Sequence, residues 1–396
     1  MAVEAKAPVP PMKPAVWNDP RYRALFFQAL ILGLVVLAGM ILIRNTLDNL
    51  ERQGIASGFG FLKTTAGFSI SMSLIEYSEE SSYARTFVVG VLNTLLVSVI
   101  GVFFATILGF VVGIARLSTN WLIARLAAVY IEVLRNIPLL LQIFFWYFGV
   151  LRTLPNPRSS IVVGDTFFLN LRGLFVPRPI FESGFWLISA ALGAAIAGVI
   201  VLARWARRRQ ERTGQRFPTF FVSLGLLIGL PLLAAIVTGF PLAWEIPELK
   251  GFNFRGGVVI VPELVALTLA LSVYTASFIA EIVRAGIQAV SHGQTEAAYS
   301  LGLRRGPTLR LVIIPQALRV IIPPLTSQYL NLTKNSSLAA AIAYPDLVLV
   351  FAGTVLMQTG QAVEIIAMTM GVYLTLSLLI SAFMNWYNRK IALVER

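Results

Sequence analysis

Residues 291–315 read SHGQTEAAYSLGLRRGPTLRLVIIP, and they lie between two long apolar stretches of the chain. Ser291 to Leu301 favours a short helix, and Gly302 readily takes the positive φ that ends one. Pro307 suits the first turn of a second helix. The segment therefore predicts a helix-turn-helix elbow, too polar to enter a membrane and shaped to enter a groove on another protein.

The composition of the chain is that of an integral membrane protein. Of 396 residues, 57% are hydrophobic and 13% charged, which leaves too little charge to coat a soluble domain. Cysteine is absent, which excludes disulfides, thiolate metal sites and cysteine nucleophiles. The single histidine, His292, cannot complete a zinc site or a catalytic relay, so we interpret it as a loop residue.

Eight membrane spans are predicted, because a hydrocarbon core of about 30 Å needs roughly 20 helical residues. Residues 311–357 are interrupted by prolines and by the polar cluster 331–337, so they hold one crossing and a shorter segment. Asp346 to Gln358 is expected to be a short amphipathic helix at the outer surface. The other spans are predicted at 24–43, 86–115, 122–151, 185–203, 218–239, 262–283 and 363–388.

The charge distribution gives the orientation. With both termini in the cytoplasm, inner segments hold 20 of the 32 lysines and arginines and outer segments hold 10. This positive-inside bias explains the net charge of +13 without any nucleic acid. The basic run at 204–216 is interpreted as an anchor beside anionic lipid headgroups.

A nucleotide site is not supported. The outer segment Gly58 to Thr64 has some likeness to a phosphate-binding loop, but Leu62 stands where that loop needs glycine beside the lysine. No other lysine follows glycine at the required spacing. The chain is therefore not expected to hydrolyse ATP in that way.

The elbow resembles the coupling motif of type I ABC importer permeases. Glu296 is followed by Ala297 and Ala298, by Gly302 six places after it, and by Ile314-Pro315 at the close. Val312 and Ile314 depart from the family's more usual isoleucine and leucine. Three further motifs are similar to the polar-amino-acid branch of that family: GVLNTLLVS at 90–98, EVLRNIPLLLQ at 132–142 and AEIVRAGIQ at 280–288.

The resemblance covers roughly residues 86–388 and implies an all-α integral membrane protein. About eight transmembrane helices are expected, five of them in the type I importer core, together with a cytoplasmic coupling helix. The additional parts are similar to the Q-type subunit of general L-amino-acid uptake systems. These are an extra N-terminal helix with a periplasmic loop at 24–85 and a helix pair inserted at 185–239, with cytoplasmic tails at 1–23 and 389–396.

The function implied by the resemblance is that of a non-catalytic permease subunit for L-amino acids in a bacterial inner membrane. Its implied partners are an ATPase dimer that uses ATP and Mg, a second permease chain and a periplasmic binding protein. The chain itself is expected to bind no cofactor or metal. The residues expected to couple to the ATPase are Glu296, Ala297, Ala298, Gly302, Arg304, Arg305 and Pro315.

A charged side chain inside a membrane span costs free energy, so each one is expected to have an ion-pair partner or a function. Glu132 and Arg135 are three residues apart, as are Glu281 and Arg284, and pairing and ligand contact both remain open. Lys334 would lie in the outer half of the membrane, where it either snorkels outward or faces the path. The residues expected along the substrate path are Arg135, Ser272, Thr275, Glu281, Asn331, Thr333, Lys334, Asn335 and Ser336.

Two alternatives to an importer subunit are a transporter that needs no partner and a membrane enzyme. A self-sufficient secondary transporter or channel for small polar solutes would explain the spans and the buried charges, but it would leave the elbow without a role. Internal inverted symmetry would favour that alternative, and the sequence shows none. A membrane enzyme would need a histidine-rich site, paired carboxylates or a Ser/His set, which the spans lack.

Overall fold

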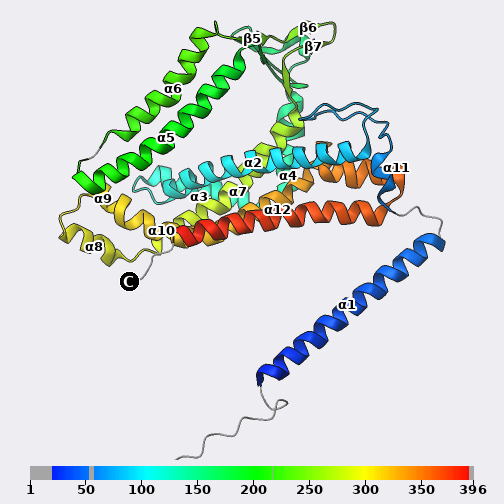
Figure 1. Ribbon diagram of the computed structural model, residues 1–396, viewed down its shortest axis with the longest axis horizontal. Coiled ribbons are helices and arrows are strands. Elements are labelled where there is room, and N and C mark those ends of the chain that lie inside the picture. The colour runs from blue at the N-terminus through cyan, green and yellow to red at the C-terminus, as the bar shows by residue number, and fades with distance from the viewer. Residues whose placement is uncertain (1–19, 53–57, 216, 392–396) are drawn as a thin grey trace, which may run out of the picture.

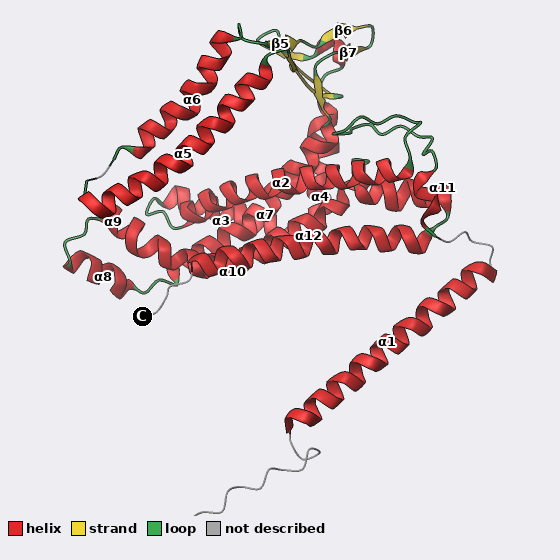
Figure 2. Cartoon of the chain, viewed as in Figure 1, coloured by secondary structure: helices red, strands yellow, loops and turns green. Residues whose placement is uncertain are grey.

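The computed structural model describes residues 20–52, 58–215 and 217–391. Within these ranges, seven helices are long and apolar enough to cross a membrane, or eight if a bent pair at 121–153 forms one span. The predicted helical membrane fold is confirmed (Figures 1 and 2). Most of the predicted N-terminal tail and residues 392–396 of the C-terminal tail lie outside the described residues.

The regular helices are numbered along the chain in Figure 1. They are α1 (Pro20–Arg52), α2 (Tyr83–Arg116), α3 (Trp121–Asn136), α4 (Leu139–Phe144), α5 (Phe185–Thr213), α6 (Thr219–Val237), α7 (Pro262–Gln288), α8 (His292–Ser300), α9 (Arg305–Thr308), α10 (Ile314–Asn335), α11 (Leu356–Thr359) and α12 (Ala362–Ile391). Shorter or irregular turns are η2 (Phe59–Lys63), η3 (Phe145–Val150), η4 (Leu151–Thr153), η5 (Pro157–Ser159), η6 (Leu309–Ile313), η7 (Ser336–Ile342) and η8 (Val348–Val355).

The centre of the bundle is the contact between α2 and α7. A Cβ added at Gly109 would lie 2.6 Å from Ile279, and one at Gly113 would lie 2.7 Å from the Ala280 carbonyl oxygen. Only glycine permits this approach, so the two helices pack closely at these two positions. At Gly225 and Gly229 in α6, by contrast, an added Cβ would meet no atom of a neighbouring element within 4 Å in the described chain.

The predicted span at 122–151 is bent. Helix α3 and the helical segment Leu139–Thr153, which begins with α4, meet at an angle of 106° around Pro138. Proline disfavours a helical conformation at the preceding residue, so the helix breaks there. The Gln142 side chain donates from Nε2 to the carbonyl oxygens of Leu134 and Ile137, both at 2.9 Å, and satisfies backbone groups that the break releases.

Residues 311–357 hold one long helix and a shorter one, as predicted. Helix α10 passes into η7, and Ala343 then takes a left-handed conformation with φ 59°. The short helix covers η8 and α11, and the residue at which it was predicted to begin, Asp346, precedes it and is not at the surface. Asp346 is only 1% exposed, and its Oδ1 accepts the backbone N–H of Leu349 at 2.8 Å.

The segments on either side of the α5–α6 pair contain short strands that the sequence did not predict. A four-stranded antiparallel sheet has the order β1-β2-β3-β8, and β4 pairs with β5 and β6 with β7. Phe175 is buried and packs against the Phe254 ring at 4.9 Å. The strands are β1 (Ile161–Val163), β2 (Phe167–Asn170), β3 (Gly173–Val176), β4 (Arg178–Phe181), β5 (Leu242–Glu245), β6 (Glu248–Lys250), β7 (Asn253–Arg255) and β8 (Val258–Ile260).

The added elements predicted at 24–85 and 185–239 include α1, which stands apart from the bundle, and the pair α5 and α6 (Figure 1). Helices α5 and α6 pack on each other, and most of the basic run predicted as a loop at 204–216 continues α5 to Thr213. No residue in the apolar stretch of helix α1 is buried against the rest of the described chain. The following outer loop packs on the bundle, where the Gly58 N–H donates to the Glu364 carboxylate in α12.

Candidate functional site

The elbow predicted at 291–315 lies at one end of the bundle, beyond the last turn of α7 (Figure 1). Helix α8 ends at Ser300, and Gly302 takes a φ of 76°. The N–H of Gly302 donates to the Tyr299 carbonyl at 2.8 Å, and that of Leu303 donates to the Ala298 carbonyl at 3.1 Å. These two bonds close the predicted turn.

The outer face of the elbow is partly apolar. Ala298 is 3% exposed and packs toward the chain, so of the two alanines only Ala297 is accessible to a partner. Leu301 is 81% exposed and Tyr299 48% exposed, and sequence analysis missed both of these apolar side chains. The exposed Glu296 carboxylate lies 3.0 Å from Nδ1 of His292 one turn earlier.

The arginines after the Gly302 turn add positive charge to the exposed surface of the elbow. Arg304, Arg305 and Arg310 are exposed, and Pro315 follows in the first turn of α10. The seven residues expected to couple to an ATPase therefore lie in one continuous elbow, although Ala298 faces inward.

A side-chain bond joins the elbow to α10. Nε2 of Gln316, in the first turn of α10, donates to Oε1 of Gln294 in α8 at 3.2 Å. Helix α10 then runs to Asn335, so Lys334 lies at the opposite end of the helix from this bond. At the elbow end, Arg319 also donates from Nε to the Ile391 carbonyl of α12 at 3.2 Å.

The polar cluster at the end of α10 divides into two faces. Asn331 and Lys334 are exposed, and Asn335 is partly exposed. Thr333 and Ser336 are buried, and their hydroxyls donate to the carbonyl oxygens of residues 329 and 333 in the preceding turn. Only the first three side chains are therefore accessible to a solute.

The two hydroxyl residues predicted on α7 serve packing. Ser272 is 5% exposed, and its Oγ lies 3.5 Å from the Gly101 carbonyl of α2. Thr275 is 3% exposed. Both side chains are buried within the described chain and do not join the accessible face of α10.

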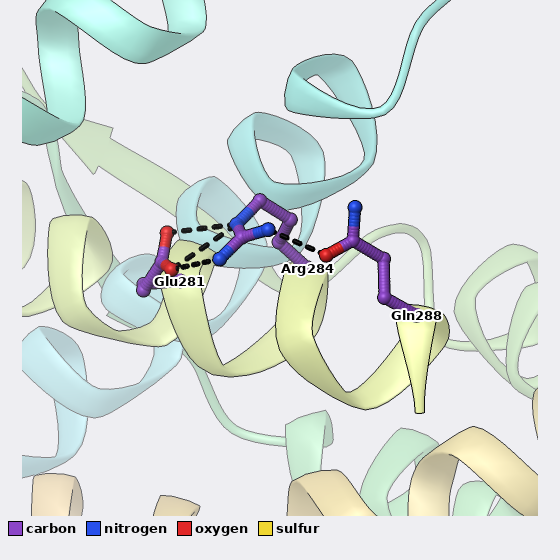
Figure 3. A network of polar contacts seen from close by, with 3 residues as sticks. All are labelled: Glu281, Arg284 and Gln288. Carbon is purple, nitrogen blue, oxygen red and sulfur yellow. Dashed lines mark hydrogen bonds and ion pairs between the residues drawn. The ribbon is translucent and has the colours of Figure 1, made fainter. Parts of the chain in front are cut away.

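Arg135 and Glu281 belong to a separate charged pocket of about 330 Å³. The Glu281 carboxylate accepts from Nε of Arg284 at 3.1 and 3.0 Å, and Nη1 of Arg284 donates to Gln288 Oε1 at 2.5 Å (Figure 3). Arg135 lies 5.0 Å above the Phe278 ring. The pocket is lined by Arg116, Ala128, Ile131, Glu132, Arg135, Glu281 and Arg284.

The two Glu/Arg pairs therefore differ. Glu281 and Arg284 form an ion pair. Among the described residues, the Glu132 and Arg135 side chains form no ion pair, although their spacing along the helix is the same.

Comparison with known proteins identifies the family. Residues 200–393 match the family described as binding-protein-dependent transport system inner membrane component. The general L-amino acid transport system permease protein AapQ of Rhizobium johnstonii is 57% identical over 380 residues, which are 96% of this chain and 94% of AapQ. The putative amino-acid ABC transporter permease protein YhdX of Escherichia coli is 58% identical over 380 residues, 96% of each chain. The glutamate/glutamine/aspartate/asparagine transport system permease protein BztB of Rhodobacter capsulatus is 44% identical over 410 residues, again 96% of each.

This chain belongs to that family. It is a permease subunit of an ABC transporter, which confirms the family assigned from the elbow motif. The described chain also holds a buried polar contact that sequence reasoning did not single out.

That contact joins α2 of the permease to the linker after η7. Asn93 is fully buried, and its Nδ2 donates to the carbonyl oxygens of Pro345 at 2.8 Å and Met72 at 2.9 Å. The Leu347 N–H donates to Thr94 Oγ1 at 3.0 Å. Asn93 and Thr94 stand in the GVLNTLLVS motif, so their presence was a signal, but Pro345 and Leu347 lie about 250 residues away in sequence.

A second contact that sequence reasoning missed is at the start of α7, the end away from the elbow. The Tyr147 hydroxyl donates to Glu263 Oε1 at 2.7 Å, and Arg152 Nη2 donates to the same hydroxyl at 3.1 Å. This chain of bonds ties η3 and η4 to the first turn of α7. It fixes the helix that leads directly to the elbow.

Proposed function

We propose that this permease forms part of the membrane path of an ATP-driven importer that moves L-amino acids from the periplasm to the cytoplasm. The observation that carries the proposal is the Gln294–Gln316 bond, which ties the elbow to the helix bearing Asn331 and Lys334. The names of AapQ, YhdX and BztB all state amino-acid transport or an amino-acid transporter, which supports this class of substrate.

The elbow is the proposed docking site for a separate ATPase, which binds the ATP and Mg. Leu301, Tyr299 and Ala297 offer an apolar surface to a groove, and Arg304 and Arg305 offer charge to partner carboxylates. Gly302 holds the turn in shape through its positive φ. Movement of the docked ATPase would then shift α8 and, through Gln316, α10.

The accessible face of α10 is the proposed contact for the substrate. Lys334 supplies a cation for the carboxylate of an amino acid, and Asn331 supplies an amide. An exposed lysine at this depth is costly against lipid, so the face needs either water or another protein chain over it. A second permease chain that closes the path satisfies this need, and a periplasmic binding protein delivers the substrate.

The proposed orientation places the elbow in the cytoplasm of a bacterium, with the chain in the inner membrane. Arg389 and Lys390 lie in the last turn of α12, which reaches the elbow end of the bundle (Figure 1). Positive residues favour the cytoplasmic side, so both this end and the elbow are placed there.

Uptake by the reconstituted complete transporter tests this function. Proteoliposomes that contain this permease, its partner permease and the ATPase are supplied with binding protein and a panel of labelled L-amino acids. We expect uptake of at least one amino acid that stops when ATP is omitted. Uptake by this chain alone, without the ATPase, would instead support the secondary-transporter alternative.

A further inference from the structure

The linker between η7 and η8 is bonded to α2 at the end of the bundle away from the elbow. Nδ2 of Asn93 donates to the Pro345 carbonyl at 2.8 Å, and the Leu347 N–H donates to Thr94 Oγ1 at 3.0 Å. In the other direction, the Tyr344 hydroxyl donates to the Asn93 carbonyl at 3.2 Å. The linker is therefore seated on one turn of α2, and η8 starts directly from this seat.

The carboxyl group of Asp346 is buried in this contact without a counter-ion. Asp346 is 1% exposed, and its Oδ1 accepts the Leu349 N–H at 2.8 Å. Within the described chain, its Oδ2 has no hydrogen bond and no lysine, arginine or histidine forms an ion pair with it. The titratable side chains that face it are Tyr344 of the linker and Tyr373 of α12.

The other groups around the carboxyl are uncharged hydroxyls and an amide. Tyr373 faces Asp346 and also Ser336 of η7 and Thr94 of α2. Among the described residues, the Tyr373 hydroxyl and Oδ1 of Asn93 are buried and have no hydrogen-bond partner. A carboxylate only accepts hydrogen bonds, whereas a protonated carboxyl also donates one. A proton on Asp346 thus adds a donor to a cluster that has buried acceptors without one.

Burial also favours the protonated form of this group. A buried carboxylate without a cation is unfavourable, because the surroundings cannot replace its water. Burial raises the pKa of the Asp346 carboxyl from its ordinary 3.8 to about 7, although the backbone N–H groups of Leu349 and Val348 lower it. Asp346 lies between the membrane-spanning segments that end at Ile342 and begin at Ala362.

We propose that Asp346 is a proton-binding site that works as a latch: the neutral carboxyl keeps the linker and η8 seated on α2, and ionisation releases them. An ionised Asp346 reaches water only when the linker separates from α2 and α12. The latch uses neither the elbow nor the accessible face of α10, so it goes beyond the proposed function and does not depend on it.

The pH range of the latch follows from the sign of the shift. The pKa of Asp346 is higher in the folded chain than in an unfolded one, so the seated state holds its proton more tightly. The stabilising contribution of the proton is complete below about pH 4, decreases as the pH rises and is lost above about pH 7. The linker is therefore expected to be seated in mildly acidic solution and loosened in mildly alkaline solution.

The experiment measures how accessible η8 is as the pH changes, in the complete transporter held in lipid nanodiscs. The chain has no cysteine, so Val350→Cys places a single thiol in η8 at a position that is 3% exposed. Met357→Cys, at a position of α11 that is 89% exposed, is the reference, because its labelling reports only how the thiol itself responds to pH. We expect the ratio of the two maleimide labelling rates to rise severalfold between about pH 6 and about pH 8.

Variants of the cluster identify the group that titrates. Asp346→Asn keeps the shape of the side chain but cannot ionise, so the ratio should stay low at every pH. Tyr373→Phe removes a hydroxyl that favours the ionised carboxyl, so the midpoint should move to a higher pH. Asp165→Asn, at an exposed turn between β1 and β2, is the matched control and should titrate like the chain with both aspartates.

Two results would overturn the latch. One is a labelling ratio that does not change with pH while Asp346 is present, and the other is an equal rise in Asp346→Asn. If Asp346→Asn does not assemble, Tyr373→Phe takes its place, and an unchanged midpoint in that variant would overturn the latch as well. Because labelling does not measure uptake, a transporter that moves no amino acid would contradict the proposed function and leave this result unaffected.

Discussion

Nε2 of Gln316 donates to Oε1 of Gln294 at 3.2 Å, and this bond joins the first turn of α10 to α8. The two residues are 22 positions apart, on either side of the Gly302 turn. Because α10 also carries Lys334, a displacement of α8 by a docked ATPase reaches the proposed substrate path through one helix. Under the proposed function, the elbow therefore acts as a mechanical link as well as a docking surface.

Loss of this bond should weaken coupling without preventing assembly. Gln316→Leu removes one neutral hydrogen bond at an accessible position, which contributes about 1 kcal/mol and corresponds to roughly a fivefold effect. We expect fewer amino acids transported per ATP hydrolysed, with the ATPase still bound. Gln294→Leu should do the same, and the double variant should be no worse than either single one. Additive losses in the double variant would show that the two side chains act independently.

The Gly302 turn should be intolerant of a β-branched side chain. Valine at a φ of 76° costs more than the roughly 1 to 2 kcal/mol of an ordinary residue in this region, so the turn should change shape. Gly302→Val is expected to lower both ATPase binding and uptake at least severalfold. Gly306→Val is the matched control, because Gly306 is an exposed glycine of the same elbow without a positive φ and with no neighbouring atom within 4 Å of an added Cβ. Equal uptake by the two variants would contradict the role given to the turn.

The positive charge of Lys334 should be needed for transport. Lys334→Met keeps the length of the side chain but removes the cation proposed for the substrate carboxylate, at a cost of about 1.5 to 3 kcal/mol for a charged hydrogen bond. Uptake should fall by roughly tenfold or more at low substrate, and Lys334→Arg should restore part of it. Lys250→Met, at an exposed lysine of β6, serves as the control. Normal uptake of every amino acid by Lys334→Met would refute the assignment.

The elbow and the helix packing could be predicted from sequence because they depend on local rules. Glycine is favoured where a helix ends in a residue with a positive φ, as Gly302 does. Glycine also permits close contact with any helix that packs against it, as Gly109 does. The number and approximate bounds of the spans follow from the length of apolar runs, which the membrane thickness fixes. These properties need no knowledge of which segments meet in space.

The side of a helix that is buried, and the contacts between residues far apart in sequence, could not be predicted in the same way. Thr333 and Lys334 are adjacent in sequence, yet one is buried and the other is exposed, because the rotation of α10 is set by its neighbours. Pro138 was visible, but its effect, a bend of 106°, depends on a Gln142 side chain that satisfies the broken backbone. The short strands around β3 and β8 pair across the inserted α5–α6 helices, so their pairing is absent from any local pattern.

The buried Asn93 should be important for stability. Its amide donates to two backbone carbonyls, so Asn93→Ala leaves both without a partner and should cost about 2 kcal/mol or more. We expect a clear fall in the thermal unfolding temperature of the purified transporter. Ser98→Ala is the control, since the Ser98 hydroxyl bonds only within its own helix, to the Thr94 carbonyl. A similar unfolding temperature for the two variants would show that the Asn93 contacts contribute little.

The most direct test of the central claim, that the elbow docks a separate ATPase and passes its motion to the path, uses one introduced cysteine. The chain has no cysteine, so Ala297→Cys is unique, and a photoactivatable thiol reagent placed there reports only its own neighbours. The account predicts a covalent product with the ATPase and loss of amino-acid uptake after illumination. Ser118→Cys, in the loop between α2 and α3, should give little of that product. Equal crosslinking at the two positions, or full uptake after Ala297→Cys has been crosslinked, would contradict the account.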